Sequence, residues 1–120
     1  MDIFCKIINN EIPSSTIYED EIVKVILDVN PKSTGHTLII PKEHCVDLFD
    51  IKEETLIYIN NISKKISKLL IDKLHCDGIE IVQNNGICEE VKHFHMHLIP
   101  VYKSDNTLTK EEVYSLLTDK

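Results

Sequence analysis

The chain has 120 residues, of which 42% are apolar and 28% charged, and its formal net charge is −7. This length suits one globular domain with one modest core, and the composition is too apolar for a disordered chain. The negative charge argues against binding to nucleic acid or anionic lipid, because both are bound chiefly through clustered Lys and Arg.

The N-terminus lacks the basic start and apolar run of a signal peptide, and no apolar stretch reaches the length of a membrane span. We therefore expect a cytoplasmic protein. In that compartment cysteines are usually reduced thiols, and this is the expectation for Cys5, Cys45, Cys76 and Cys88.

The first half of the chain is predicted to form strands. Two β-leaning runs, residues 15–19 and 22–28, flank a short Asp20-Glu21 turn and predict a hairpin. The apolar residues 37–40, which precede Pro41, predict a short buried strand.

The second half begins with the main predicted helix. Asp50 and Glu53 have the spacing of a capping box, and apolar residues then recur every three or four positions. This pattern predicts a helix over about residues 51–75. An alternating strand follows at 79–83 and leads into the turn signal Asn84-Asn85-Gly86.

The last predicted strand covers residues 93–101. Beyond it, Thr109 and Glu112 are spaced to cap a short helix with Val113, Leu116 and Leu117 on one side. We expect a single α+β domain over residues 1–120, with a core at about 2–101 and a tail at 102–120. An antiparallel sheet with helices on one face is the expected architecture.

Three of the six histidines, His93, His95 and His97, alternate with the apolar residues Phe94 and Met96. On a strand, alternate residues face opposite sides, so one face would be chemical and the other would be core. Imidazoles two residues apart then stand about 7 Å apart and can reach one small ligand. Near neutral pH histidine can act as nucleophile, base or acid, and a neutral imidazole can attack phosphorus to form a covalent intermediate.

Two other interpretations of the triad remain open. The histidines could lie on a solvated strand face, or they could form the three-histidine ligand set of a catalytic zinc hydrolase.

The pattern His-φ-His-φ-His-φ-φ at residues 93–99, where φ is apolar, resembles the hallmark of the histidine-triad (HIT) family of nucleotide hydrolases and transferases. The resemblance runs from about residue 2 to 101, with similar landmarks at residues 2–13, 28–31, 35–42 and 84–86. It implies a HIT-like fold with a five-stranded antiparallel sheet, a long helix and a short helix. It also implies a homodimer that joins two sheets into ten strands.

The resemblance implies a role for each matching residue. His95 would be the nucleophile and His97 would steady the phosphate, while His93 and His36 would complete the histidine network. Asn84 would hold a phosphate-side oxygen, and Asp28 would accept hydrogen bonds from the ribose hydroxyls, unless it only initiates the turn before Pro31. The apolar base pocket would be built from Phe4, Ile7, Ile22 and Leu27.

The loop before His93 departs from the family pattern. Glu89 and Glu90 stand where family members carry a Gln and a hydroxyl residue, and the loop is two residues shorter. An ionised carboxylate cannot donate to a phosphate oxygen and repels it. We expect both glutamates to point to solvent. Alternatively, one is protonated, activity is weak, or a carboxylate selects a substrate with a cationic group.

Some family members hold a structural zinc ion, and the matching residues here are Asp2, Cys5, His44 and His93. Asp replaces a Cys in this set, so zinc is an open expectation and no cofactor is expected to be required for the chemistry.

The sequence therefore predicts an enzyme that cleaves a nucleoside 5′-phosphate derivative through a nucleotidyl-histidine. The substrate would be a purine nucleotide conjugate such as a phosphoramidate, an adenylylated adduct or a dinucleoside polyphosphate. The alternative is a catalytically weak nucleotide-binding module.

Overall fold

The computed structural model describes residues 2–119. A five-stranded antiparallel sheet forms its centre, in the order β1-β2-β3-β5-β4. The strands are β1 (Thr16–Glu19), β2 (Val23–Leu27), β3 (Thr37–Pro41), β4 (Gly78–Val82) and β5 (Met96–Val101), and the helices are α1 (Ile3–Ile8), α2 (Glu53–Leu74) and α3 (Lys110–Thr118), with one 3₁₀ turn, η1 (Gly86–Cys88). The predicted α+β class and the five-stranded sheet are confirmed.

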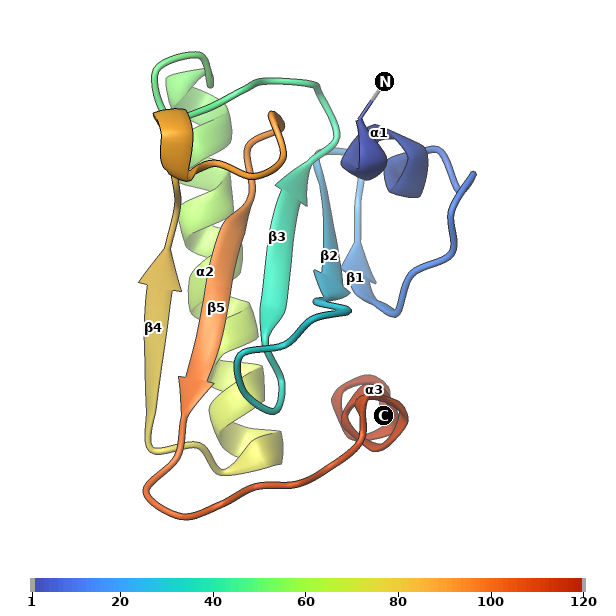
Figure 1. Ribbon diagram of the computed structural model, residues 1–120, viewed down its shortest axis with the longest axis vertical. Helices are drawn as coiled ribbons and strands as arrows, with labels where there is room; N and C mark the ends of the chain where they lie inside the picture. The colour runs from blue at the N-terminus through green and yellow to red at the C-terminus, as the bar shows by residue number, and fades with distance from the viewer. Residues whose placement is uncertain (1, 120) are drawn as a thin grey trace.

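The long helix α2 runs behind the sheet in Figure 1 and covers one of its faces. Its buried stripe, including Ile59, Ile66 and Leu70, packs on Val25 and Ile39 of the central strands. Helix α3 adds Val113 and Leu117 to this core, whereas Leu116, predicted on the same side, is 38% exposed. The predicted cap of α3 is confirmed, because Thr109 and Glu112 form a reciprocal capping box.

Helix α1 lies against the opposite face of the sheet. Phe4 and Ile7 of α1 form a second, smaller cluster with Ile26, Leu38 and Ile40. The expectation that the helices share one face is therefore wrong. Residues 3–8 gave no helix signal in the sequence, because one and a half turns are too short to display a helical period.

The start of α2 also differs from the prediction. Lys52, not Asp50, is the N-cap residue, and no side chain caps this end. The Asp50 carboxylate instead accepts a hydrogen bond from the Val46 backbone N–H. At its other end α2 stops at His75, which adopts a left-handed conformation with φ of 56°.

Strand β5 holds a central place between β3 and β4. His97 pairs with Leu38 on one side and with Val82 on the other. Its side chain therefore projects from the middle of the sheet, on the face that carries α1. No helix within residues 2–119 combines the length and hydrophobicity needed to cross a bilayer.

Candidate active site

The three triad histidines lie at the entry of β5, but only His97 is within the strand. Residues 93–95 precede Met96, where β5 begins, so the predicted strand over 93–101 starts three residues too early. The backbone N–H of Phe94 donates to the carbonyl of Cys45, 2.7 Å away, instead of joining a ladder. The predicted alternation still holds, because Phe94, Met96 and Leu98 all enter the core behind the sheet.

His95 is 6% exposed, and one of its nitrogens is already engaged. Its Nδ1 lies 2.7 Å from the backbone carbonyl of His93. A carbonyl can only accept, so Nδ1 carries the proton. The Nε2 atom of neutral His95 therefore has a free lone pair, which is what a nucleophile requires.

His97 is held in the other tautomer by a relay of hydrogen bonds. The Lys32 backbone N–H donates to Nδ1 of His36 over 3.0 Å, so the proton of neutral His36 is on Nε2. That Nε2–H donates to Nδ1 of His97 over 2.9 Å. The remaining proton of His97 is therefore on Nε2, which becomes a hydrogen-bond donor.

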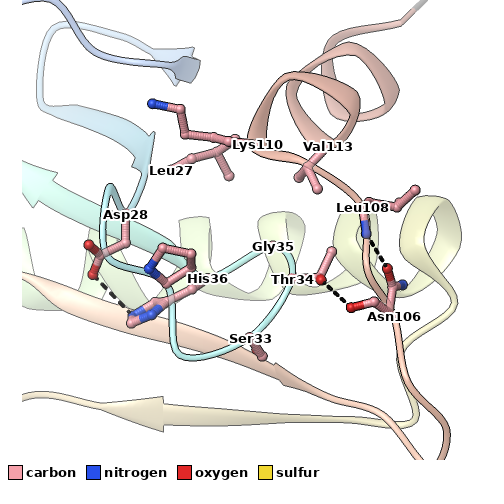
Figure 2. Close-up of a pocket in the computed structure, with 11 residues that line it drawn as sticks. Leu27, Asp28, Ser33, Thr34, Gly35, His36, Asn106, Leu108, Lys110 and Val113 are labelled. Atoms are coloured by element: carbon pink, nitrogen blue, oxygen red, sulfur yellow. Dashed lines mark hydrogen bonds and ion pairs between the residues drawn. The ribbon is translucent and has the colours of Figure 1, made fainter.

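Burial keeps both relay imidazoles neutral. It lowers the pKa of His97 to about 4, with added repulsion from His95 and His36. Burial also lowers the pKa of His36, although the nearby Asp28 carboxylate acts in the opposite direction. Asp28 Oδ2 lies 3.5 Å from His36 Nε2, and Figure 2 shows the carboxylate pointing at this imidazole.

Gly35 allows the loop that carries His36 to approach α2. Its φ is +89°, and a Cβ at this position would lie 2.5 Å from Cδ1 of Leu74. A side chain at position 35 would therefore be strained by the positive φ and would collide with the side chain of Leu74. The loop is consequently pressed against the end of α2, with His36 directed at His97.

Two cavities meet at His95 and His97. The first, of about 320 Å³, is polar, and the predicted residues Asp28, His36 and Asn84 line it together with Lys32, Cys88 and Glu90. The second, of about 240 Å³, is mainly apolar and extends under α1. Its lining includes Phe4, Ile7, Ile26, Leu27, Leu38 and Val91. Together the cavities offer an apolar slot beside a polar, histidine-lined one.

One predicted pocket residue is misplaced. Ile22 is 42% exposed in the β1–β2 turn, where it lines a separate depression beside Lys52 and Tyr58. The apolar cavity instead uses Ile26 from β2, with Leu38 opposite it in β3. The sequence carried a usable signal, since Ile26 alternates with the core residues Val25 and Leu27.

The two glutamates of the short loop have different environments. Glu90 is exposed and lines both cavities, in contact with the same space as His95 and His97. Glu89 is 3% exposed, and neither carboxylate oxygen has a hydrogen-bond partner among residues 2–119. Burial raises the pKa of Glu89, which Lys92 only partly offsets. The expectation that both glutamates point to solvent is therefore wrong for Glu89.

His93 belongs to a separate group of polar side chains. Its Nε2–H donates to the Pro41 carbonyl over 2.8 Å, so its Nδ1 carries the lone pair. That Nδ1 lies 3.5 Å from Cys5 Sγ, 3.3 Å from His44 Nδ1 and 3.3 Å from Asp2 Oδ2. Within residues 2–119 no potential metal group brings the three triad histidines together, so the three-histidine zinc interpretation gains no support.

A cluster of potential metal ligands, formed by Asp2, Cys5, His44 and His93, has the dimensions of a tetrahedral metal site. Two further distances are 3.6 Å from Cys5 Sγ to His44 Nδ1 and 3.2 Å from His44 Nδ1 to Asp2 Oδ2. Ligands of a tetrahedral zinc ion, about 2.0–2.3 Å from the metal, stand roughly 3.3–3.7 Å from each other.

A buried polar atom supports the same conclusion. Asp2 Oδ2 is buried without a hydrogen-bond partner in the described chain. Burial would raise the pKa of Asp2, but the Cys5 N–H and His93 outweigh it and lower the pKa. The cluster thus presents an anionic oxygen, a sulfur and two imidazole nitrogens at one point, and this set fits zinc.

The fold places His95, whose Nε2 has a free lone pair, between an apolar and a polar cavity. Residues 9–104 match the family model described as the HIT domain. The chain belongs to the histidine-triad (HIT) family.

Its relatives include characterised and uncharacterised proteins. It is 43% identical over 113 residues to an uncharacterized HIT-like protein of Methanocaldococcus jannaschii, covering 92% of this chain and 86% of that protein. It is 45% identical over 100 residues to the adenosine 5′-monophosphoramidase HNT1 of Saccharomyces cerevisiae, covering 82% of this chain and 61% of the yeast protein.

A solved structure is also similar to this chain in fold. The crystal structure of a zinc-bound histidine triad family protein from Mycobacterium smegmatis aligns with a TM-score of 0.90 at 36% identity, covering 97% of this chain and 89% of that chain.

Proposed function

We propose that this protein is a nucleotide-binding hydrolase that cleaves a nucleoside 5′-phosphate derivative through a nucleotidyl-histidine at His95. The observation that carries the proposal is the hydrogen bond from His95 Nδ1 to the His93 carbonyl, 2.7 Å long. It leaves the Nε2 lone pair free beside two adjoining cavities of about 320 and 240 Å³. Similarity to a yeast adenosine 5′-monophosphoramidase supports the same chemistry.

In the first step, His95 Nε2 forms a bond to phosphorus as the bond from phosphorus to the leaving group breaks. The leaving group departs with the bonding electron pair and takes up a proton. The nucleotidylated imidazole is positively charged, and its Nδ1–H remains bonded to the His93 carbonyl, which stabilises that charge. In the second step, water attacks phosphorus, loses a proton and releases the nucleotide, so that His95 is regenerated.

The surrounding residues have complementary roles in this proposal. His97 donates its Nε2–H to a phosphate oxygen, and His36 fixes the tautomer that makes this possible. Asn84 contributes on the phosphate side, and Asp28 accepts from ribose hydroxyls. A purine base occupies the apolar cavity against Phe4, Ile7 and Leu27.

Zinc has a structural place in the proposal, away from the reacting phosphorus. Asp2, Cys5, His44 and His93 would hold the ion. A metal with four protein ligands stabilises the fold and offers no open position to a substrate. The hydrolytic chemistry proposed here uses only the histidines and no cofactor.

A homodimer is also proposed, formed by pairing of β4 with its copy. Among the described strands, β4 is at an edge of the sheet and is hydrogen-bonded only to β5, and Ile81 on it is 56% exposed. Such an edge is usually covered or paired. The mass of the protein in solution, measured by light scattering for the wild type and for Ile81→Lys, tests this assembly.

The hydrolase proposal is tested by intact-protein mass spectrometry after brief mixing with an adenosine phosphoramidate at neutral pH. We expect one added nucleotidyl mass on the wild type and none on His95→Ala. An equal adduct on both proteins would contradict the assignment of His95.

A catalytically weak binding module is the second candidate. It is favoured by Glu90, whose carboxylate lines both cavities where a hydrogen-bond donor would help a phosphate. Tight binding of AMP with no adduct and no product would support this candidate.

A further inference from the structure

Helix α1 connects the metal cluster to the nucleoside cavity. Asp2 and Cys5, at the start of the helix, belong to the cluster, whereas Phe4 and Ile7 line the apolar cavity. The centroid of the Phe4 ring lies 4.8 Å from that of His95 and 6.0 Å from that of His93. One short helix therefore carries two metal ligands on one side and two pocket residues on the other.

Asp2 performs two tasks with its two oxygens. Oδ1 accepts a hydrogen bond from the Cys5 N–H over 2.8 Å and so caps α1. Oδ2 lies 3.2 Å from His44 Nδ1 and 3.3 Å from His93 Nδ1, facing the centre of the cluster. A carboxylate can serve both partners at once because it has lone pairs on two oxygens. A cysteine at this position has one sulfur and could not divide these tasks in the same way.

The two ends of α1 are held by different means. At the C-terminal end, the buried Lys24 donates from Nζ to the Ile7 carbonyl and to Asn10 Oδ1, both over 3.0 Å. At the N-terminal end, the side chains of Asp2 and Cys5 have polar contacts with His44 and His93 of the cluster. The N-terminal end is therefore the end that a bound metal would fix.

His95 does not depend on the metal in the same way. Its partner is the backbone carbonyl of His93. That residue is also held by its own Nε2–H on the Pro41 carbonyl and by its N–H on the Val91 carbonyl. Loss of the metal should thus loosen the wall of the cavity more than it disturbs the nucleophile.

We infer that a zinc ion held by Asp2, Cys5, His44 and His93 positions the nucleoside, because it fixes the first turn of α1 and thereby holds Phe4 against His95. This inference rests on the proposed function, since it takes the apolar cavity as the base site. Asp2 and Cys5 are positioning residues here. A preformed wall improves affinity by removing the entropy cost of ordering it when the ligand binds.

The test compares two probes, AMP and ribose 5-phosphate, by calorimetric titration of the full chain after chelator treatment and after loading with Zn²⁺. Zinc should lower the Kd of AMP about three- to tenfold, the cost of ordering one or two side chains. The Kd of ribose 5-phosphate, which lacks the base, should change less than twofold. Equal AMP affinity of the zinc-loaded and zinc-free proteins, or failure to bind zinc at all, would overturn the inference.

Two variants distinguish the effect of losing the metal from the effect of changing helix α1 itself. His44→Ala removes a ligand that is half-exposed and lies outside both α1 and the cavity, so its AMP affinity should equal that of the zinc-free wild type at any zinc concentration. Asp2→Asn retains an oxygen to cap α1 but loses the anionic ligand, and it should need more zinc to reach the same AMP affinity. A zinc response that persists in His44→Ala without bound metal would contradict the coupling.

The outcome is distinguishable from failure of the hydrolase proposal. Zinc-dependent AMP binding without a nucleotidyl adduct at His95 would retain the coupling and refute the chemistry. An adduct that forms equally with and without zinc, at unchanged AMP affinity, would refute the coupling and retain the chemistry.

Discussion

His93 and His97 are four residues apart, yet they belong to two regions with different chemistry. His93 presents the Nδ1 lone pair to a cluster of metal-binding side chains, and its Nε2–H is bound to the Pro41 carbonyl. His97 accepts at Nδ1 from His36 and lines the polar cavity, with its remaining proton on Nε2. Between them, His95 has the opposite tautomer, with the proton on Nδ1. The partner that each imidazole meets in the fold therefore sets its tautomer, and under the proposed function these tautomers suit a ligand at His93, a nucleophile at His95 and a donor at His97.

The strongest test of whether the two regions act separately is to remove one histidine from each, His95 from the cavity region and His44 from the metal-ligand cluster. We expect His95→Ala to lower kcat by at least about 10³-fold, because the covalent route is lost, while zinc stoichiometry stays unchanged. His44→Ala should lose zinc and keep kcat within about threefold. Steady-state kinetics and metal analysis of the two purified variants check both expectations. Loss of kcat in both variants to the same extent would show that the regions are not separate.

The protonation state of the cavity region should appear in the pH dependence of stability. The pKa of His97 is about 4 in the folded protein, against 6.5 as its ordinary value. At pH values between 4 and 6.5 the unfolded chain binds more protons at this residue than the folded protein does. The free energy of unfolding therefore falls as the pH falls from 6.5 to 4. After allowance for partial exposure we expect a loss of about 1–2 kcal/mol. Thermal unfolding of the wild type and of His97→Gln checks this, since the variant should lack that part of the slope.

Glu89 offers a smaller test, because it is a carboxylate buried near the site without a partner. Its pKa is raised by burial, so ionisation costs stability as the pH rises above the ordinary value of 4.5. Glu89→Gln should raise the free energy of unfolding at pH 7 by about 1 kcal/mol and have no effect near pH 4. Denaturant unfolding measures this. The matched control is Glu90→Gln, an exposed neighbour that should leave stability unchanged at both pH values.

The smallest expected effect concerns substrate choice at Glu90. Its carboxylate shares the cavities with His95 and should favour a leaving group that carries an ammonium group over a polyphosphate. Glu90→Gln should shift the ratio of kcat/KM between a diamine conjugate of AMP and diadenosine triphosphate about two- to fivefold toward the latter, as one partly screened charge pair would give. Competition assays with both substrates measure the ratio. An unchanged ratio would mean that Glu90 does not contact the leaving group.

Local patterns predicted most of the sheet and the long helix. The alternation of His and apolar residues at 93–98 correctly placed Phe94, Met96 and Leu98 in the core. The helical period correctly predicted α2 to within about two residues at each end. These features depend on which side of an element is buried, and a periodic sequence records that directly.

Some of the errors concern contacts between distant segments. The different hydrogen-bond partners of His93 and His97 are Pro41 and His36, which lie more than fifty residues away in the sequence. The burial of Glu89 depends on how its loop folds back. The Asp50 error is different, because its partner Val46 is only four residues away. The prediction for Ile22 failed for a local reason, because Ile22 lies in the turn before β2 and lines a different depression from Ile26.

The loop that carries Asp28 and His36 is tied to a much later part of the chain. Thr34 Oγ1 donates to the carbonyl of Asn106, 72 residues further on, and Figure 2 shows Asn106 beside the Thr34 end of the loop. Tyr102 adds a second bond to the same loop, at the carbonyl of Thr34. Ribosomes add about 5–20 residues per second, so about 4–14 s pass between synthesis of the loop and of its anchor. The segment that anchors the His36 loop is thus made after both His36 and His97, so this loop lacks its two bonds to Tyr102 and Asn106 until residues 102–106 are synthesised.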